Sequence, residues 1–325
     1  LFRSIAAIQL LIRFFYIKYC NKRFPESILI SIFDKQLVKE MGKFMGWNIW
    51  GNLAGTLFST GLNLLLNVFF GPVVNAARAV AVQVETAIAQ FSTNFLMAVN
   101  PQITKLYAQN NLQDMHKLLF RASKFTFILL LVLSLPVMIE TEMILKVWLK
   151  IVPNYTVVFL RLLLCIVIVD SVARPLMTAA AATGNVKLYQ SLIGGILLSI
   201  VPIAYIVLKL GGSPDSVYVV HLVICVIAFF TRLWVIKPMI QLSIQQYFSN
   251  VILRCMIILA VSLPLCLLFK SALPTGIIPA TAVCLFCVLT ALAVSYLLGL
   301  TPSERQFVHV QILDLSQKVL RIRYD

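Results

Sequence analysis

The chain has 325 residues, of which 60% are hydrophobic and only 12% are charged, and its mean hydropathy is +0.94. Soluble domains carry about 25% charged residues, so this composition leaves too little polar surface for a fold in water and indicates a membrane protein. The net charge of +15 does not indicate a nucleic-acid partner, because the basic residues lie mainly between apolar segments and no basic-aromatic patch or zinc-finger spacing occurs.

Two segments precede the complete transmembrane segments. Residues 1–18 are apolar but too few for a bilayer core, which needs about 20 apolar residues, so we interpret them as the end of a truncated transmembrane helix. The chain begins with Leu1 within this apolar segment and shows no signal peptide, so we expect it to be the C-terminal portion of a longer protein. Residues 19–44 are expected to form a cytoplasmic amphipathic linker, because residues 28–44 place apolar residues and lysines on opposite faces at helical spacing.

Eight apolar segments of transmembrane length follow, and they predict an all-α integral membrane protein built as a bundle of transmembrane helices. The first six segments form a unit over 45–237, two additional helices lie within 250–299, and residues 300–325 form a polar, basic tail. The predicted segments are 45–69, 75–99, 122–146, 155–182, 187–209, 215–237, 250–269 and 277–299.

The basic residues between these segments predict the orientation. Most of them, Lys124 and Arg232 included, are assigned to the side of the 19–44 linker, whereas the other side holds Lys146, Lys150, Lys209 and Lys270. Because loops rich in Lys and Arg stay on the cytoplasmic side, we expect the linker to be cytoplasmic. An even number of segments then places the C-terminal tail on the cytoplasmic side as well.

Polar residues recur along the first complete segment at steps of three or four, which places them on one helical face. A polar face is unfavourable against lipid, so it meets either another helix or water. Hydrogen bonding between closely packed helices is one interpretation. We favour the wall of an aqueous cavity, because four asparagines exceed what packing requires. The polar or small residues of this face are Asn48, Asn52, Gly55, Thr56, Ser59, Asn63 and Asn67.

The second complete segment repeats the pattern with Asn75, Thr86, Gln90 and Asn94 on one face. Arg78 and Glu85 lie seven residues apart at the edge of that face. An ionisable residue within a membrane segment suggests a functional role, which makes both residues candidates for a substrate cavity. Alternatively, Arg78 extends its side chain to the nearby membrane surface, or each residue pairs with another helix.

The segment 155–182 carries Asp170 and Arg174, four residues apart and followed by Pro175. This spacing predicts either a mutually neutralising pair beside a helix kink, or a gate or anion contact. His221, near the start of its segment, is interpreted as a hydrogen-bonded helix residue.

No catalytic constellation occurs. The sequence lacks the nucleotide-binding motif GxxxxGK[ST], the hydrolase motif GxSxG and the metalloprotease motif HExxH, so we expect neither an enzyme nor a cofactor. Cys284 and Cys287 form a CxxC within an apolar segment without further ligands nearby, so no metal site is expected. If the chain is a transporter, its energy must then come from an ion gradient, the substrate gradient or later consumption of the product.

Three stretches resemble one family: KFMGWNIWGNLAG at 43–55, the long run at 67–108, and AAAATGNVKLYQ at 179–190. Together they resemble the polysaccharide transporters, the Wzx-type O-antigen flippases of the MATE-like MOP superfamily. The resemblance implies a protein of two six-helix lobes and two extra helices, of which this chain would hold the interlobe linker, the C-lobe and both extra helices.

The family resemblance implies a substrate as well: an oligosaccharide linked to polyprenyl pyrophosphate, flipped across the bacterial inner membrane for lipopolysaccharide or polysaccharide synthesis. A polysaccharide polymerase or ligase would then act on the product, and Na⁺ or H⁺ is a candidate coupling ion. Among the candidate residues, Arg78 and Arg174 are the expected cations for the pyrophosphate.

The alternative is a MATE-like drug or metabolite antiporter. Such a protein would need an acidic residue deep in the cavity, and Glu85 and Asp170 qualify. A membrane-bound glycosyltransferase or polymerase is a third hypothesis, which the short outer loops disfavour.

Overall fold

The computed structural model describes residues 2–24, 34–306 and 309, and for residues 2–6 it describes the backbone alone. Within these ranges the chain is helical without a strand, as predicted. The helices are α1 (Phe2–Arg23), α2 (Lys35–Ala108), α3 (Leu112–Ile139), α4 (Thr141–Leu149), α5 (Thr156–Ala182), α6 (Lys187–Leu198), α7 (Ile200–Lys209), α8 (Ser216–Ile240), α9 (Ile244–Tyr247), α10 (Leu253–Ser271) and α11 (Ile277–Val294). A π-helical turn, Phe248–Ile252, joins α9 to α10, and another, Ser295–Gly299, ends α11.

The chain divides into two compact units, residues 1–43 and 44–325. In the first unit, α1 runs to Arg23 and so extends past the predicted helix end at residue 18. Part of the predicted linker, residues 25–33, lies outside the described residues. From Lys35 onward the linker is the first part of α2, which continues through residue 45 without a break, so no separate linker helix ends at residue 44.

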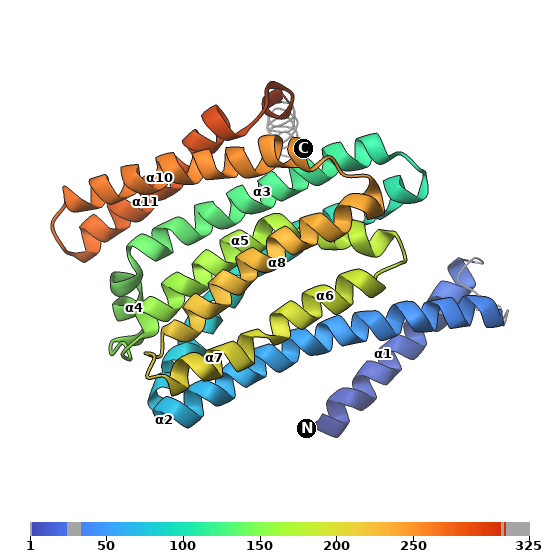
Figure 1. The fold of residues 1–325 in the computed structure, drawn as a ribbon, viewed down its shortest axis with the longest axis horizontal. Coiled ribbons are helices and arrows are strands. Elements are labelled where there is room, and N and C mark those ends of the chain that lie inside the picture. Colours follow the sequence, from blue (N-terminus) through green and yellow to red (C-terminus); the bar gives the residue numbers. More distant parts are fainter. Residues whose placement is uncertain (1, 25–33, 307–308, 310–325) are drawn as a thin grey trace. The chain divides into compact units, whose positions relative to one another are not determined.

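Seven of the described helices are long and apolar enough to cross a membrane, and they establish a multi-pass membrane protein. One of them, α2, is bent at Gly71 (φ 80°, ψ −176°), a backbone conformation that glycine adopts without steric cost, and Pro72 begins the next segment. Figure 1 shows the chain reversing direction there, so α2 consists of two arms. Since α2 supplies two crossings, the helices match the eight predicted segments in order.

The boundaries of α3 differ from the prediction of 122–146. This helix begins at Leu112, because the Asn111 side chain accepts a hydrogen bond from the Asp114 backbone N–H and caps its first turn. It ends at Ile139, and the short helix α4 follows. The polar residues near 112–121 are therefore the first turns of a transmembrane helix, whereas the sequence pattern assigned them to a loop.

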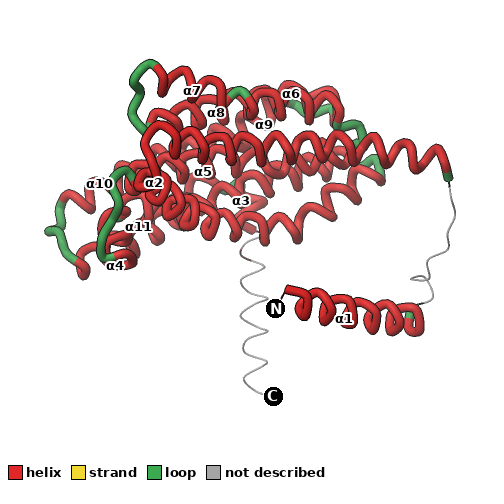
Figure 2. The backbone as a smooth tube through the Cα atoms, turned by 90° about the horizontal axis from the view of Figure 1, so that it is seen from below, coloured by secondary structure: helices red, strands yellow, loops and turns green. Residues whose placement is uncertain are grey.

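The core of the second unit is centred on α3 and α5. The most apolar windows of α3 and α5 have 61% of their residues buried, against 11% for α2. On one side, α3 packs against α11, and α10 and α11 pack against each other (Figure 2). On the other side, α8 packs against α5, and α6 and α7 pack against α8. This order places α2 and its polar residues at the edge of the core.

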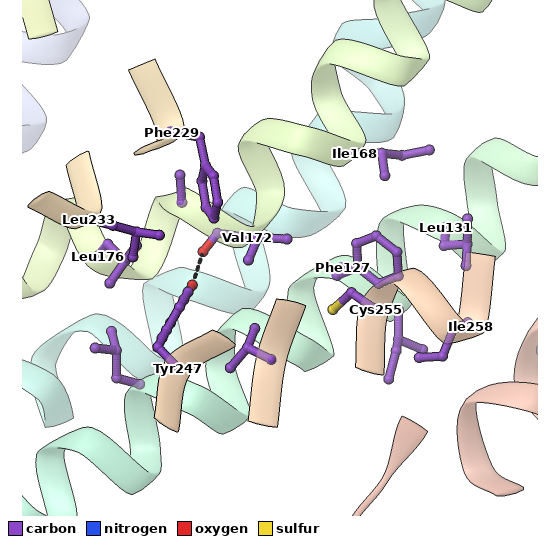
Figure 3. Packing of buried hydrophobic residues seen from close by; sticks show 14 of the residues in the cluster. Phe127, Leu131, Ile168, Val172, Leu176, Phe229, Leu233, Tyr247, Cys255 and Ile258 are labelled. Atoms are coloured by element: carbon purple, nitrogen blue, oxygen red, sulfur yellow. Dashed lines mark hydrogen bonds between the residues drawn. The ribbon is translucent and has the colours of Figure 1, made fainter. Parts of the chain in front are cut away.

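A buried tyrosine ties the short helix α9 to this core. The Tyr247 hydroxyl donates a hydrogen bond to the Val172 carbonyl oxygen (2.9 Å) on α5, and Figure 3 shows it among buried apolar side chains that include Phe229, Leu233 and Leu176. A buried hydroxyl without a partner is costly, so this bond fixes where the last two transmembrane helices begin.

Candidate functional site

The first feature of the candidate site is the exposed polar face of α2. Of the predicted cavity residues on its two arms, Asn52, Ser59, Gln90 and Asn94 are exposed. Gln90 Nε2 donates a hydrogen bond to Asn94 Oδ1 (3.0 Å). Amide groups exposed to lipid would be left without partners in hydrocarbon, so this face of α2 meets water or another protein surface.

Asn48 belongs to a different environment, a contact between helices. Its Oδ1 accepts a hydrogen bond from Gln190 Nε2 (3.0 Å) on α6, and its own Nδ2 donates to the Phe44 carbonyl oxygen (2.9 Å). Beside it, a Cβ added to Gly51 would lie 2.0 Å from Gln190 Oε1, so α2 and α6 approach closely at this point. At Asn48, therefore, the structure shows the interhelical hydrogen bond and close glycine packing of the alternative interpretation.

A cavity of about 200 Å³ lies between the two arms of α2, α5 and α8, and we call it the Arg78 cavity. Arg78 Nη2 donates to the Ser59 carbonyl oxygen (3.2 Å), which holds the guanidinium between the arms. Its Nε is buried without a hydrogen-bond partner among the described residues, and so is His221 Nδ1. The buried Tyr218 hydroxyl interacts with Arg78. The lining residues are Phe58, Ser59, Leu62, Arg78, Val82, Glu85, Leu163, Ile166, Val167, Tyr218 and His221.

Buried nitrogens of Arg78 and His221 that have no partner among the described residues suit this cavity to polar matter, either water or a polar ligand group. The sequence suggests a hydrogen-bonded helix residue at His221, but its Nδ1 has no hydrogen-bond partner in the part of the chain that the structure describes, and its ring lies against Phe58 (5.1 Å between centroids). Arg78 lines the cavity, and its guanidinium is held at the Ser59 carbonyl oxygen.

Two further candidates flank this cavity on the α2 arms. Asn75 is half-buried, and its Oδ1 has no hydrogen-bond partner within the described ranges. Asn63 is also half-buried, on the arm that precedes Gly71. Neither is among the residues that line the Arg78 cavity.

The second charged feature is a cluster around Asp170, which we call the Asp170 cluster. Arg174 Nε lies 3.5 Å from one carboxylate oxygen, as the spacing of four residues predicted. Arg232 Nη1, from α8, lies 2.7 Å from the other oxygen. Arg174 also donates through Nη1 to the Thr93 hydroxyl (3.3 Å), which connects the cluster to the second arm of α2.

The sequence pattern missed Arg232, Tyr218, His221 and Thr93 as members of the site. Arg232 was assigned to the cytoplasmic side by the charge count, and so was Lys124. The structure shows that both are buried ion-pair partners, with exposed fractions of 5% and 1%. The available signal was a charged residue within the bounds of a predicted membrane segment, because such a residue often pairs with a charge on another helix.

The Arg78 cavity and the Asp170 cluster lie within electrostatic range of each other. Glu85 interacts with both Arg174 and Asp170, and His221 interacts with Asp170. Arg78 and Glu85 line the same cavity without forming an ion pair among the described residues, and Glu85 accepts a hydrogen bond from the Thr86 hydroxyl (3.3 Å). Within the described ranges, three guanidinium groups, those of Arg78, Arg174 and Arg232, face the carboxylates of Glu85 and Asp170, so positive charge is in excess there.

The arrangement favours binding of a polar or anionic group. Guanidinium groups match the oxygens of phosphates and carboxylates through paired N–H donors. In the described residues, no group of three or more His, Cys, Asp or Glu side chains is placed to hold a metal ion.

Comparison of the chain with protein-family models, with curated proteins and with solved structures gave no match.

Proposed function

We propose that this chain is part of a flippase that translocates polyprenyl-pyrophosphate-linked oligosaccharide across the bacterial inner membrane for lipopolysaccharide or polysaccharide synthesis. The observation that carries the proposal is the exposed polar face of α2 in a multi-pass membrane protein, with the guanidinium-rich Arg78 cavity and Asp170 cluster beside it. The resemblance of residues 43–55, 67–108 and 179–190 to the Wzx-type branch of the MATE-like superfamily supports the same function.

The three parts of the proposed substrate would meet different surroundings. Its glycan is polar and would be shielded from lipid by amide and hydroxyl groups such as Asn52, Ser59 and Asn94. Its polyprenyl chain would remain in the bilayer, where no protein cavity is needed. Its pyrophosphate would be attracted by Arg78 and Arg174, which act as charge-assisted donors.

The proposal includes a topology and partners. The 19–44 linker and the C-terminal tail would face the cytoplasm, and the exposed α2 face would meet the N-lobe of the complete transporter. The flipped product would be consumed by a polysaccharide polymerase or ligase, and that consumption, or Na⁺ or H⁺, would supply the direction of transport.

The experiment that tests the proposal replaces Arg78 by Gln in the full-length protein, in cells deleted for the intact gene. Loss of one charge-assisted contact costs about 1.5–3 kcal/mol, so we expect export of the glycan to fall roughly tenfold or more. Lipid-linked oligosaccharide should accumulate on the cytoplasmic leaflet while the variant inserts normally. The matched control is Lys105→Gln, because Lys105 is an exposed cation in the last turn of α2. Normal surface glycan in the Arg78 variant would exclude the role of this residue.

One observation favours a second candidate, a cation-coupled drug or metabolite antiporter of the same superfamily. Glu85 lines the Arg78 cavity and forms no ion pair among the described residues, so it is the acidic side chain that a cation would find. Asp170 is less suited, because two arginines neutralise it. Deleting the gene separates the candidates: unchanged surface glycan with increased retention of cationic dyes would favour the antiporter.

A further inference from the structure

A second cavity, of about 250 Å³, lies away from the proposed transport site, and we call it the interfacial pocket. It lies between α4 and the connection from α10 to α11, which are close together in Figures 1 and 2. Both elements join transmembrane helices at their ends, so the pocket lies at the boundary between membrane and water. Its lining residues are Glu140, Glu142, Met143, Lys146, Lys270, Leu273, Pro274, Thr275, Gly276, Pro279, Ala280 and Val283.

One side of the interfacial pocket is fixed by a partly buried ion pair. Glu140 is 8% exposed, and its Oε1 lies 3.3 Å from Lys270 Nζ. Lys270 also donates to the Ile139 carbonyl oxygen at the end of α3. These contacts join the ends of α3 and α10, so the position of this charged pair is determined by the fold.

Two further charged side chains of the lining, Glu142 and Lys146, remain available to a ligand. Glu142 and Lys146 lie four residues apart on α4, and both side chains are exposed. In the part of the chain that the structure describes, neither forms an ion pair. The pocket therefore combines two carboxylates and two ammonium groups, with one group of each sign free to bind a ligand.

Apolar groups continue from the pocket along the outside of the helices. Val147 and Trp148 on α4 are 64% and 48% exposed, and Ile278 at the start of α11 is 82% exposed. Tryptophan and exposed aliphatic side chains at the ends of transmembrane helices are typical of the headgroup level of a bilayer. A ligand with charges at one end and hydrocarbon chains at the other fits this surface.

We infer that the interfacial pocket binds a zwitterionic phospholipid whose headgroup carries a primary ammonium, such as phosphatidylethanolamine. The ammonium binds Glu142, the phosphate binds Lys146, and the acyl chains lie against the exposed apolar residues of α4 and α11. An anionic headgroup without a cation would leave Glu142 facing the phosphate, and a headgroup with a quaternary ammonium cannot donate a hydrogen bond to this carboxylate. The bound lipid holds α4 against the α10–α11 connection. This inference is independent of the transported substrate.

Native mass spectrometry after release from nanodiscs tests the inference. The discs contain equal parts of phosphatidylethanolamine, phosphatidylcholine and phosphatidylglycerol, and the purified full chain is delipidated in steps. We expect phosphatidylethanolamine to be retained preferentially. Glu142→Gln should abolish its preference over phosphatidylcholine with up to about fivefold weaker retention, the magnitude of one exposed or partly exposed charge contact. Lys146→Gln should weaken retention of all three lipids.

Asp215→Asn is the matched control, because Asp215 directly precedes α8, whose start lies at the same end of the bundle as α4 (Figure 1), and does not line the pocket. Glu142 and Lys146 are exposed, so their variants should keep the helical content of the unaltered chain, which circular dichroism checks. Equal retention of the three lipids by the unaltered chain would overturn the inference. Retention that is the same in the Glu142 and Lys146 variants as in the Asp215 control would overturn it as well.

Discussion

Two charged groups within the bundle, Lys124–Glu304 and the Asp170 cluster, differ in balance and exposure. Lys124 on α3 pairs one-to-one with Glu304, and the two side chains are 1% and 5% exposed. Glu304 also accepts a hydrogen bond from the Thr301 backbone N–H (2.8 Å), so its carboxylate is well satisfied. Asp170, by contrast, is 27% exposed and shared by two arginines.

The difference separates a structural contact from a ligand-facing one. A balanced pair that is buried on both sides offers a ligand no accessible donor, and it fixes the segment at 300–306 to α3. An accessible cluster with more cations than carboxylates keeps donors that a bound anion would satisfy. This distinction predicts that substitutions in the Lys124–Glu304 pair change stability. Substitutions at Arg174, the more exposed arginine of the Asp170 cluster, should instead change transport.

The largest expected effect comes from Glu304→Gln. This change leaves the Lys124 ammonium buried without its counter-charge, and breaking a buried ion pair in this way costs about 3–5 kcal/mol. Unfolding in detergent, followed by circular dichroism, measures the loss. Replacing both residues, Lys124→Met with Glu304→Leu, should recover most of it, because no unpaired charge remains. A single variant as stable as the unaltered chain would show that the pair does not fix the segment.

Replacing Arg232 should lower the free energy of unfolding less than replacing Glu304, because Asp170 has a second partner, Arg174. Arg232→Gln removes the contact at 2.7 Å but leaves Arg174 beside the carboxylate, so we expect a loss of about 1–3 kcal/mol in the free energy of unfolding. A double variant with Asp170→Asn should lose less than the sum of the single changes, since the two residues interact directly. Strict additivity in the same unfolding assay would contradict the pairing.

The pH dependence of stability sharpens the comparison further. Burial raises the pKa of Glu304, but hydrogen bonds from Lys124 and Thr301 outweigh it and hold the pKa below its ordinary value of 4.5. Glu304 therefore contributes stability above pH 4.5, and this contribution is lost as the pH falls through the lower pKa of the folded state. Thermal unfolding between neutral and acidic pH should show this loss in the unaltered chain and a smaller loss in Glu304→Gln. Equal acid sensitivity would assign the loss to other groups.

The sequence predicted what depends on local spacing. The helical class, the order of the segments, the break near Gly71 and the Asp170–Arg174 contact all follow from residues a few positions apart. The Asp170–Arg232 contact joins residues 62 positions apart, and the Lys124–Glu304 contact joins residues 180 positions apart. Periodicity shows which face of a helix is polar, but the partner of that face depends on how the helices pack.

Asn48 illustrates the same limit at the candidate site. Asn48 and Asn52 belong to the same periodic series and lie on the same helical face. Asn48 nevertheless accepts a hydrogen bond from Gln190 on α6, whereas Asn52 is exposed. The exposed members of the series, which the structure leaves without a helix against them, are the ones that remain candidates for substrate contact. The Tyr218 and His221 groups of the Arg78 cavity come from α8, whose sequence shows no comparable polar series.

The smallest expected effect on stability, and the one that separates the two charged groups most directly, comes from Arg174→Gln. Arg174 is 27% exposed and Asp170 keeps Arg232, so the unfolding free energy should fall by about 1 kcal/mol or less. Export of the glycan in cells carrying the full-length variant should nevertheless fall about tenfold, because a charge-assisted contact to the pyrophosphate is lost. Arg174→Lys, which keeps the charge but not the paired donors, should restore part of the export. A variant with lowered stability and unchanged export would place Arg174 with Lys124 and Glu304 among the structural charges, and Arg78 alone would then remain as the candidate cation for the substrate.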